Sequence, residues 1–328
     1  MRARKAVRPV RGNEHRNLAV ALAGTAAVLA GMALVNIAQT KRAEEKRPPL
    51  GDFVTVDGVR LHYVERGAGT PVVLIHGNAT MVQDWVISGV LDALAQSHRV
   101  IAFDRPGFGY SERPRSRIWT PAAQADLLAK AFSALGIEAA TVVGHSLGTQ
   151  VAIALALNHG GAAGQLVLLG GYYYPTVRPD ALLAAPAALP LIGDLLRFTV
   201  SPLWGAAMVP QANAKLFAPA AIPEIWTDAF PFSLMLRPSQ IHAEAADGAM
   251  MVPASAELSK RSDELMLPVA ILAGAGDRIA DPIKQSRRLH ETLPHSRFQL
   301  VKGAGHMVHH TALMRVVDAI EGDAGARR

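Results

Sequence analysis

The sequence predicts an α/β protein built on a mostly parallel, doubly wound sheet with helices on both faces. Short apolar runs recur along the chain, and helical patterns follow most of them. Strands that alternate with helices in this way are typical of a parallel sheet covered on both sides. A third observation, the loss of this alternation between residues 171 and 265, predicts an insertion into the same domain.

The composition supports one large folded unit and excludes several kinds of site. The 328 residues are 50% hydrophobic and 18% charged, which is enough apolar material for a core and excludes intrinsic disorder. The absence of cysteine excludes a disulfide scaffold, a zinc–cysteine site, an iron–sulfur cluster and a cysteine nucleophile.

The net charge of +6 is unevenly distributed along the chain. Residues 1–47 hold ten basic and three acidic residues, a net +7, so the other 281 residues carry a net −1. The folded body therefore offers no basic face of the kind that binds nucleic acid, and we expect no nucleic-acid partner.

The amino-terminal segment predicts a membrane anchor. Leu18–Ala38 is a run of 21 residues without charge, and a helix of that length spans a bilayer core of about 30 Å. The basic tail before it, residues 1–17, is expected to stay cytoplasmic, which places a tether at 39–51 and the remaining chain on the periplasmic or extracytoplasmic side. Two alternatives stay open, a cleaved signal peptide (with a cleavage site such as that after Ala33) and an alanine-rich helix that is buried or disordered.

Eight strands and four principal helices are expected in the body of the protein. Asp57-Gly58 is a two-residue hairpin turn, because both positions tolerate positive φ. The strands are predicted at Phe53–Val56, Val59–Glu65, Pro71–Ile75, Val100–Phe103, Thr141–Val143, Leu166–Leu169, Val269–Ala273 and Phe298–Val301. The helices are predicted at Pro121–Leu135 (capped by Thr120 and ended by Gly136), Leu147–Asn158, Pro282–Leu293 and Leu313–Ile320.

The insertion at 171–265 is predicted to be a helical cap over the carboxyl edge of the sheet. It holds 11 of the 21 prolines and no buried-strand run, so short helices broken by proline are expected. Its aromatic, leucine and methionine content argues against a disordered loop. The core then comprises residues 52–170 and 266–320, followed by a tail at 321–328.

A serine nucleophile is predicted where the fifth strand meets the helix that follows it. Gly144-His145-Ser146-Leu147-Gly148 matches the pattern G-x-S-x-G at that junction. A sharp strand-to-helix turn presents the serine at the sheet edge, and the glycines are needed because the turn leaves no room for side chains. The alternative is a tight turn in which Ser146 only caps the helix.

Such a serine needs a base, and the base needs a carboxylate that orients it. Asp277 and His306 lie just past the seventh and eighth predicted strands, in the chain order serine, acid, histidine. They are the predicted acid and base. Asp281, His309 and His310 are rivals, but they lie deeper in the following helices.

Two backbone N–H groups are predicted to form an oxyanion hole. One belongs to Leu147, directly after the serine, and the other to Asn78, in the loop after the third strand. His76 in that loop is expected to have a structural role. His145, Tyr172 and Trp85 are candidates for the substrate pocket.

The loop from Asp104 to Ser111, with the sequence Asp-Arg-Pro-Gly-Phe-Gly-Tyr-Ser, follows the fourth strand. We expect it to be a scaffold in which Asp104 and Arg105 hold neighbouring loops together.

With these motifs in this order, the chain from Asp52 to Ile320 resembles the α/β-hydrolase fold superfamily. The resemblance implies a serine hydrolase, esterase- or lipase-like, with its cap after the sixth strand. The H-G-N-A-T wording at His76–Thr80 is similar to haloalkane dehalogenases. Those enzymes and the epoxide hydrolases of this fold carry an aspartate nucleophile where this chain has Ser146, so neither activity is expected.

The expected reaction is hydrolysis of a carboxylic ester through an acyl-enzyme on Ser146, without a cofactor. An apolar cap and a membrane anchor favour an apolar or lipid-like small-molecule ester. The alternatives are carbon–carbon bond hydrolysis or cofactor-free perhydrolysis on the same residues, and, more remotely, a non-catalytic membrane-tethered binding protein. No metal is expected, because His309 and His310 are neighbours on a predicted helix and should face different points. The sequence does not set the acyl chain length or the oligomeric state.

Overall fold

The computed structural model describes residues 11–176 and 179–322. Its eight strands form one sheet in the order β1-β2-β4-β3-β5-β6-β7-β8. β1 pairs antiparallel with β2, and β2 with β4, whereas all other neighbours are parallel. The strands are β1 (Asp52–Val56), β2 (Val59–Arg66), β3 (Thr70–Ile75), β4 (His98–Phe103), β5 (Ala140–His145), β6 (Ala163–Leu169), β7 (Val269–Gly274) and β8 (Arg297–Val301). The predicted mostly parallel sheet is confirmed.

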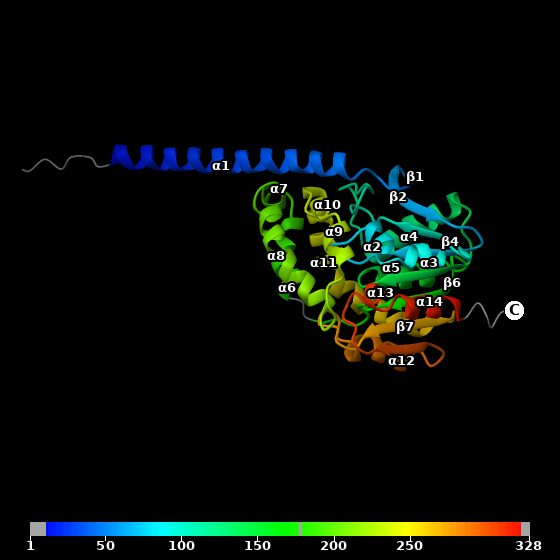
Figure 1. Cartoon of the computed structure of the whole chain (residues 1–328). Helices are drawn as coiled ribbons and strands as arrows, with labels where there is room; N and C mark the ends of the chain where they lie inside the picture. Colours follow the sequence, from blue (N-terminus) through cyan, green and yellow to red (C-terminus); the bar gives the residue numbers. More distant parts are fainter. Residues whose placement is uncertain (1–10, 177–178, 323–328) are drawn as a thin grey trace, which may run out of the picture.

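Helices cover both faces of this sheet (Figure 1). Alternate residues of β3 point to opposite faces, so Val73 and Ile75 join one core while Val72 and Leu74 join the other. The first core is covered by α4 (Pro121–Ala134), α5 (Gly148–Asn158) and the pair η3 (Ile283–Arg287) and α12 (Arg288–Thr292). The second is covered by α2 (Val82–Ile87), α3 (Val90–Leu94), α13 (Val308–Thr311) and α14 (Leu313–Glu321).

The predicted turns and caps are present. Asp57 and Gly58 adopt φ of 51° and 72° in the β1–β2 turn. The Thr120 hydroxyl accepts a hydrogen bond from the Ala123 N–H at 3.1 Å, which caps α4. Gly136 follows that helix with φ 63°.

A helical cap lies between β6 and β7. It comprises α6 (Pro179–Ala184), η1 (Ala185–Ala188), α7 (Ile192–Phe198), α8 (Val200–Phe217), α9 (Glu224–Ala229), α10 (Phe232–Met235), α11 (Pro238–Leu258) and η2 (Ser259–Glu264). The expectation of short helices was wrong for α8 and α11, which run through 18 and 21 residues although they contain Pro210 and Pro253. An internal proline removes one helical hydrogen bond, and tertiary packing compensates for that loss.

A buried ion pair fastens α11 to the core. Arg105 donates to Asp247 of α11 and, at 3.0 Å, to Gln124 of α4. The same guanidinium donates at 3.0 Å to the carbonyl oxygens of His76 and Gly77. Arg105 therefore ties the cap to the loop after β3, which lies beside Ser146.

The helix α1 (Arg11–Lys46) is long and apolar enough to cross a membrane. Its most apolar window contains no buried residue, which contradicts the alternative of a buried helix. The tether expected at 39–51 is also corrected, because the helix continues to Lys46 and Ala43 is buried against the cap. Packing against the cap stabilises the last turns of α1. Their polar composition alone predicts a linker, because it does not reveal this packing.

Candidate active site

Ser146 lies on a tight turn between β5 and α5, with φ 52°. The flanking glycines permit this turn. A Cβ atom on Gly148 would lie 2.4 Å from the Ile75 carbonyl oxygen, and one on Gly144 would lie 2.8 Å from the Gly148 carbonyl oxygen. Side chains at either position would force the turn apart, which explains the G-x-S-x-G pattern.

The structure brings Ser146, His306 and Asp277 into one hydrogen-bonded chain. The Ser146 hydroxyl donates to His306 Nε2 at 3.0 Å, and His306 Nδ1 donates to Asp277 Oδ2 at 2.8 Å. The other carboxylate oxygen of Asp277 accepts from the N–H groups of Ile279 and Ala280 at 2.7 and 2.9 Å. The side chains of Ser146, His306 and Asp277 are all buried. These hydrogen bonds hold Asp277 as an acceptor that orients the imidazole.

The rival residues lie elsewhere. Asp281 accepts from two main-chain N–H groups at the start of η3, at 3.0 and 3.1 Å. His309 and His310 both donate to Asp84. Only Asp277 and His306, of the residues weighed for acid and base, are hydrogen-bonded in line with Ser146.

The loop after β3 packs directly against the serine turn. A Cβ atom on Gly77 would lie 3.0 Å from the Ser146 Cβ atom. The Asn78 side chain donates to the Glu244 carbonyl oxygen of α11 at 3.1 Å. Within residues 11–176 and 179–322, the backbone N–H groups of Asn78 and Leu147 have no hydrogen-bond acceptor. Both are free to donate to an oxygen at this place.

His76 has the structural role expected of it. Its Nδ1 donates to the Gly77 carbonyl oxygen at 2.7 Å, and its Nε2 accepts from the Arg105 N–H at 3.0 Å. Burial and the nearby Arg105 charge lower its pKa to about 4, so the ring is neutral near pH 7.

Asp104 is the centre of the scaffold expected in its loop. It accepts from the Val82 N–H at 2.8 Å, from His62 Nδ1 at 2.7 Å and from the Tyr110 N–H at 2.9 Å. Burial alone would raise the pKa of this carboxyl, but these donors hold it below its ordinary value. Asp104 thus joins β2, α2 and its own loop.

The three residues expected in the pocket have different positions. Tyr172 packs against Leu147, beside the serine turn, where the cap meets the core. His145 is buried beneath that turn, with its ring 4.9 Å from the His306 ring. Trp85 is a fully buried residue of α2 that packs in the core with residues of α3, so its assignment to the pocket is corrected to core packing.

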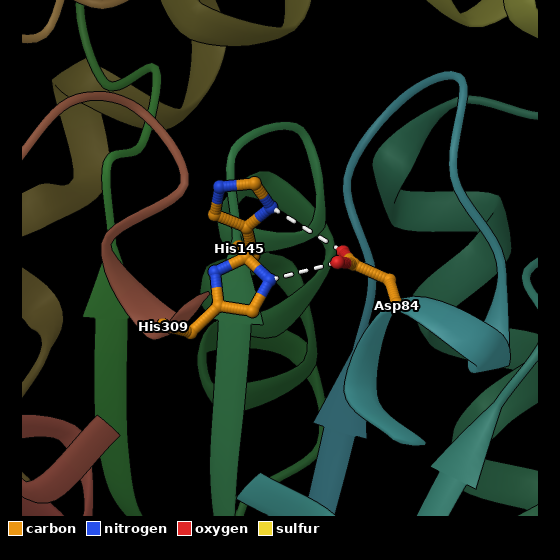
Figure 2. Close-up of side chains that lie close together, drawn as sticks. All are labelled: Asp84, His145 and His309. Atoms are coloured by element: carbon orange, nitrogen blue, oxygen red, sulfur yellow. Dashed lines mark hydrogen bonds and ion pairs between the residues drawn. The ribbon is translucent and has the colours of Figure 1, made fainter. Parts of the chain in front are cut away.

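A second buried polar cluster lies next to His306, whose ring is 4.9 Å from the ring of His145 in that cluster. Figure 2 shows Asp84, His145 and His309 converging from α2, β5 and α13. His309 and His310 both donate from Nε2 to Asp84 Oδ1, at 2.9 and 2.7 Å. The expectation that these two neighbours face different points was wrong, because α13 has only four residues and its end turns both rings toward Asp84.

Among the described residues, this cluster is the one whose spacing suits a metal ion. The ligand atoms of Asp84, His145 and His309 lie within 4.8 Å of one another, although the sequence predicts no such group. Burial and the neighbouring His309 and His306 rings hold the pKa of His145 well below its ordinary value. In the structure Asp84 Oδ1 accepts hydrogen bonds from both His309 and His310, so the cluster is a carboxylate that orients two imidazole rings.

The family model for the α/β-hydrolase fold matches residues 70–313, which include the serine turn, Asp277 and His306. The chain belongs to the α/β-hydrolase fold family. The match covers most of the chain and includes the strands β3 to β8 with the cap between β6 and β7. The protein is therefore a hydrolase by family, as the sequence predicts.

This chain is similar to two curated hydrolases from Pseudomonas. It is 39% identical over 129 residues to 2-hydroxymuconate semialdehyde hydrolase from Pseudomonas sp. (strain CF600), a match of 39% of this chain and 46% of that protein. It is 27% identical to 2-hydroxy-6-oxo-2,4-heptadienoate hydrolase from Pseudomonas putida, over 79% of this chain and 90% of that protein. The first match thus spans about half of that relative.

The fold is shared with a thermophilic esterase from Thermogutta terrifontis. The TM-score is 0.63 at 24% identity, over 84% of this chain and 99% of the esterase. At this identity the likeness shows the fold alone.

Sequence reasoning missed Asp84, Glu244 and Asp247, which contact His309, Asn78 and Arg105 respectively. Asp84 is a single carboxylate in the apolar stretch Met81–Ile87, and that isolation is the one signal that marks it. Glu244 and Asp247 lie on a cap helix whose contacts with the core no local pattern predicts.

Proposed function

We propose that this hydrolase cleaves carboxylic esters with an apolar part, through an acyl-enzyme on Ser146. The observation that carries the proposal is the hydrogen-bonded chain from the Ser146 hydroxyl through His306 to Asp277, at 3.0 and 2.8 Å. A serine hydroxyl is a weak nucleophile unless a base takes its proton, and His306 is in position to do so.

The reaction proceeds in two halves. His306 Nε2 accepts the Ser146 proton as the hydroxyl oxygen bonds to the ester carbonyl carbon, and the protonated ring then donates that proton to the departing alcohol. Water attacks the resulting acyl-serine with His306 again as base, which releases the acid and restores the serine. Asp277 holds the imidazole in the required tautomer and stabilises its charged form.

The N–H groups of Asn78 and Leu147 stabilise the oxyanion formed in each half. The close packing of Gly77 on Ser146 and the hydrogen bond from Asn78 to the Glu244 carbonyl fix the loop that carries one donor. A single donor of this kind is typically worth about 3–4 kcal/mol of transition-state stabilisation.

The charged side chain nearest to Leu147 is already paired. A small pocket there is lined by Arg105, Gln124, Gln150, Val151, Asp247 and Met250, among others. The charge of Arg105 is balanced by Asp247, and its remaining donors point to Gln124 and two carbonyl oxygens. Among these lining residues the cation is Arg105, whose charge is already balanced, and this supports a neutral substrate beside Leu147.

Carbon–carbon bond hydrolysis is the second candidate. The names of two relatives, a semialdehyde hydrolase and a heptadienoate hydrolase, favour it. The same serine would attack a ketone carbonyl, and the leaving carbon would then need a proton. A dienoate carries a carboxylate, which a free cation would bind. Arg105 is already paired with Asp247, so this reaction is the second candidate.

We also propose that α1 anchors the enzyme in a membrane, with the hydrolase on the extracytoplasmic side. The support is the length and apolar character of α1, together with the basic excess before residue 18. A signal sequence would have the same features, and mass determination of the mature membrane-bound chain distinguishes the two.

The test is covalent labelling of the full chain, purified in detergent, with a fluorophosphonate. Labelling confined to Ser146, and lost in both Ser146→Ala and His306→Ala, is the expected outcome. The same variants should lose about 10⁴–10⁶-fold of kcat on p-nitrophenyl esters. A folded protein that stays unlabelled would overturn the serine mechanism. Faster turnover of a 2-hydroxy-6-oxo-dienoate than of any ester would instead assign carbon–carbon hydrolysis.

A further inference from the structure

Exposed large apolar side chains gather in one stretch of the cap. Eight of them lie within the 22 residues from 183 to 204, whereas seven are scattered over the rest of the described body outside α1. Leu191 is 83% exposed and Trp204 is 67% exposed. This surface is called the apolar cap face, and it consists of Leu183, Leu189, Leu191, Ile192, Leu195, Val200, Leu203 and Trp204. Exposed apolar side chains concentrated in this way mark a place of interaction.

The face carries little charge. Asp194 and Arg197 are the charged residues between 183 and 204, and they form an ion pair with each other. Asp194 also pairs with Arg115 of the core at 2.6 Å. The face therefore suits an apolar occupant, and the acyl region of a lipid bilayer is one.

The helix α1 is attached to the cap within the stretch that carries this face. The Asn36 side chain donates to the carbonyl oxygens of Phe198 and Thr199, between α7 and α8, at 2.8 and 2.9 Å. Further along α1, Glu44 pairs with Arg237 at 2.8 Å. Two such attachments fix the direction of α1 relative to the cap.

The free half of α1 leaves the body on the side of the apolar cap face. In Figure 1 its N-terminal half projects beyond α7, toward the side where α6 and α8 lie. Every residue from 15 to 28 of this half is exposed. About 20 helical residues cross a bilayer core, so a bilayer that holds this half reaches the level of α7 and α8.

We propose that the apolar cap face docks into the same bilayer that α1 crosses, at the boundary between head groups and acyl chains. The inference rests on the proposed anchor. Trp204 suits that boundary, where tryptophan is enriched in membrane proteins. Since α6, η1 and α7 pack on α11, and α11 meets the loop at Asn78, the docked cap places the site close to esters dissolved in the membrane.

Tryptophan fluorescence of the full chain, reconstituted in phosphatidylcholine vesicles, tests the docking. Trp85, Trp119 and Trp226 are buried, so Trp204 is the one exposed tryptophan of the four. Brominated acyl chains should quench much of the emission, and aqueous iodide should quench little. Trp204→Phe should remove the bromine-sensitive part.

A charge on the face supplies the functional readout. Leu191→Glu should reduce bromine quenching and slow hydrolysis of a long-chain ester carried in the vesicles, with unchanged turnover of soluble p-nitrophenyl acetate. Met266→Glu, an equally exposed position on the core, is the matched control and should change neither.

The other outcomes overturn the proposal. Protein that floats with the vesicles while iodide reaches Trp204 keeps the anchor and excludes docking. Protection of Trp204 from both quenchers would assign the face to a second copy of the chain. Protein that does not float removes anchor and docking together, while activity on the soluble ester still reports on the serine mechanism separately.

Discussion

At the scale of single residues, the site depends on how closely Gly77 approaches Ser146. A Cβ atom at Gly77 would lie 3.0 Å from the Ser146 Cβ atom and 3.1 Å from His145 Nδ1, both closer than ordinary contacts. Neither neighbour can move freely, because Ser146 is held on a turn with φ 52° and His145 is buried. The backbone at this glycine thus sets the position of the proposed Asn78 donor.

Gly77→Ala is therefore expected to lower kcat/KM about 10–100-fold, because the oxyanion donor shifts by a fraction of an ångström. The cost in unfolding free energy should stay near 1–3 kcal/mol, typical of overpacking. Ester kinetics and urea unfolding measure the two. Gly160→Ala, with open space around its Cβ position, is the control. Full activity of Gly77→Ala would mean that this loop is not part of the reaction.

Glu244 makes the unfolding free energy of the protein depend on pH. Burial raises its pKa from 4.5 to about 7. Between these values the folded protein keeps a proton that the unfolded chain has released, so the unfolding free energy falls as the pH rises from about 4.5 to 7. Part of the residue remains exposed, which puts the expected loss at about 1–3 kcal/mol.

Glu244→Gln should therefore stabilise the protein at pH 8 and change little at pH 4.5. Urea unfolding at both pH values measures this. Glu257→Gln, at an exposed glutamate of the same helix, should leave the pH dependence as it is. If Glu244→Gln proved neutral at pH 8, the Glu244 carboxyl would be solvated rather than buried.

The predictability of these residues from the sequence depended on the distance to their partners. Ser146 could be predicted from a local pattern, and Asp277 and His306 from their places after strands, because parallel strands end at one edge. Asp84 and Glu244 could not. The histidines that hold Asp84 lie 225 and 226 residues away, and Glu244 meets Asn78 across 166 residues.

At the scale of elements, α11 depends on one buried charge cluster. Asp247 accepts from Arg105 and, at 2.8 Å, from Arg113, and all three side chains are almost fully buried. Without the carboxylate, two guanidinium groups would lie buried with no balancing charge at this place. Removing one partner of a buried ion pair typically costs about 3–5 kcal/mol.

Asp247→Ala is accordingly expected to lower the unfolding free energy by about 3–5 kcal/mol and to release α11 from the loop at Gly77. Asp247→Asn, which keeps the acceptor oxygen, should lose less. Calorimetry or urea unfolding gives the ranking, with the exposed Asp263→Ala as the control on the cap. Equal losses for the alanine and asparagine variants would show that charge, rather than hydrogen bonding, decides the contact.

A helix or strand was predictable where its length was sufficient for its hydrophobic pattern to appear in the sequence. The strands were found because each is a short apolar run between turns. The helices α2 and α3 have six and five residues, too few to show a helical period, and they were missed. In α8 and α11, proline predicted an end that tertiary packing overrides.

At the scale of the whole molecule, the last turns of α1 belong to the folded body. One face of the helix turns toward the cap, where Asn36 and Ala43 are buried. Ala43 joins an apolar cluster with Phe217, Trp226 and others, and the end of the helix is met by the Tyr110 hydroxyl, which donates to the Arg47 carbonyl oxygen. A chain that begins at Gly51 lacks all of these contacts.

Removal of residues 1–50 should therefore destabilise the hydrolase by about 2–4 kcal/mol, since it uncovers apolar surface and leaves hydrogen-bond partners of α1 unpaired. A chain that begins at Leu29 keeps the packed face and should match the full chain in unfolding free energy. Urea unfolding of both truncated chains in the same detergent measures the difference. The variant Asn36→Ala in the longer chain isolates the two hydrogen bonds to α7 and α8. If the chain from Gly51 unfolded at the same urea concentration as the chain from Leu29, α1 would be an appendage, and the fixed direction that aims the apolar cap face at the membrane would be lost with it.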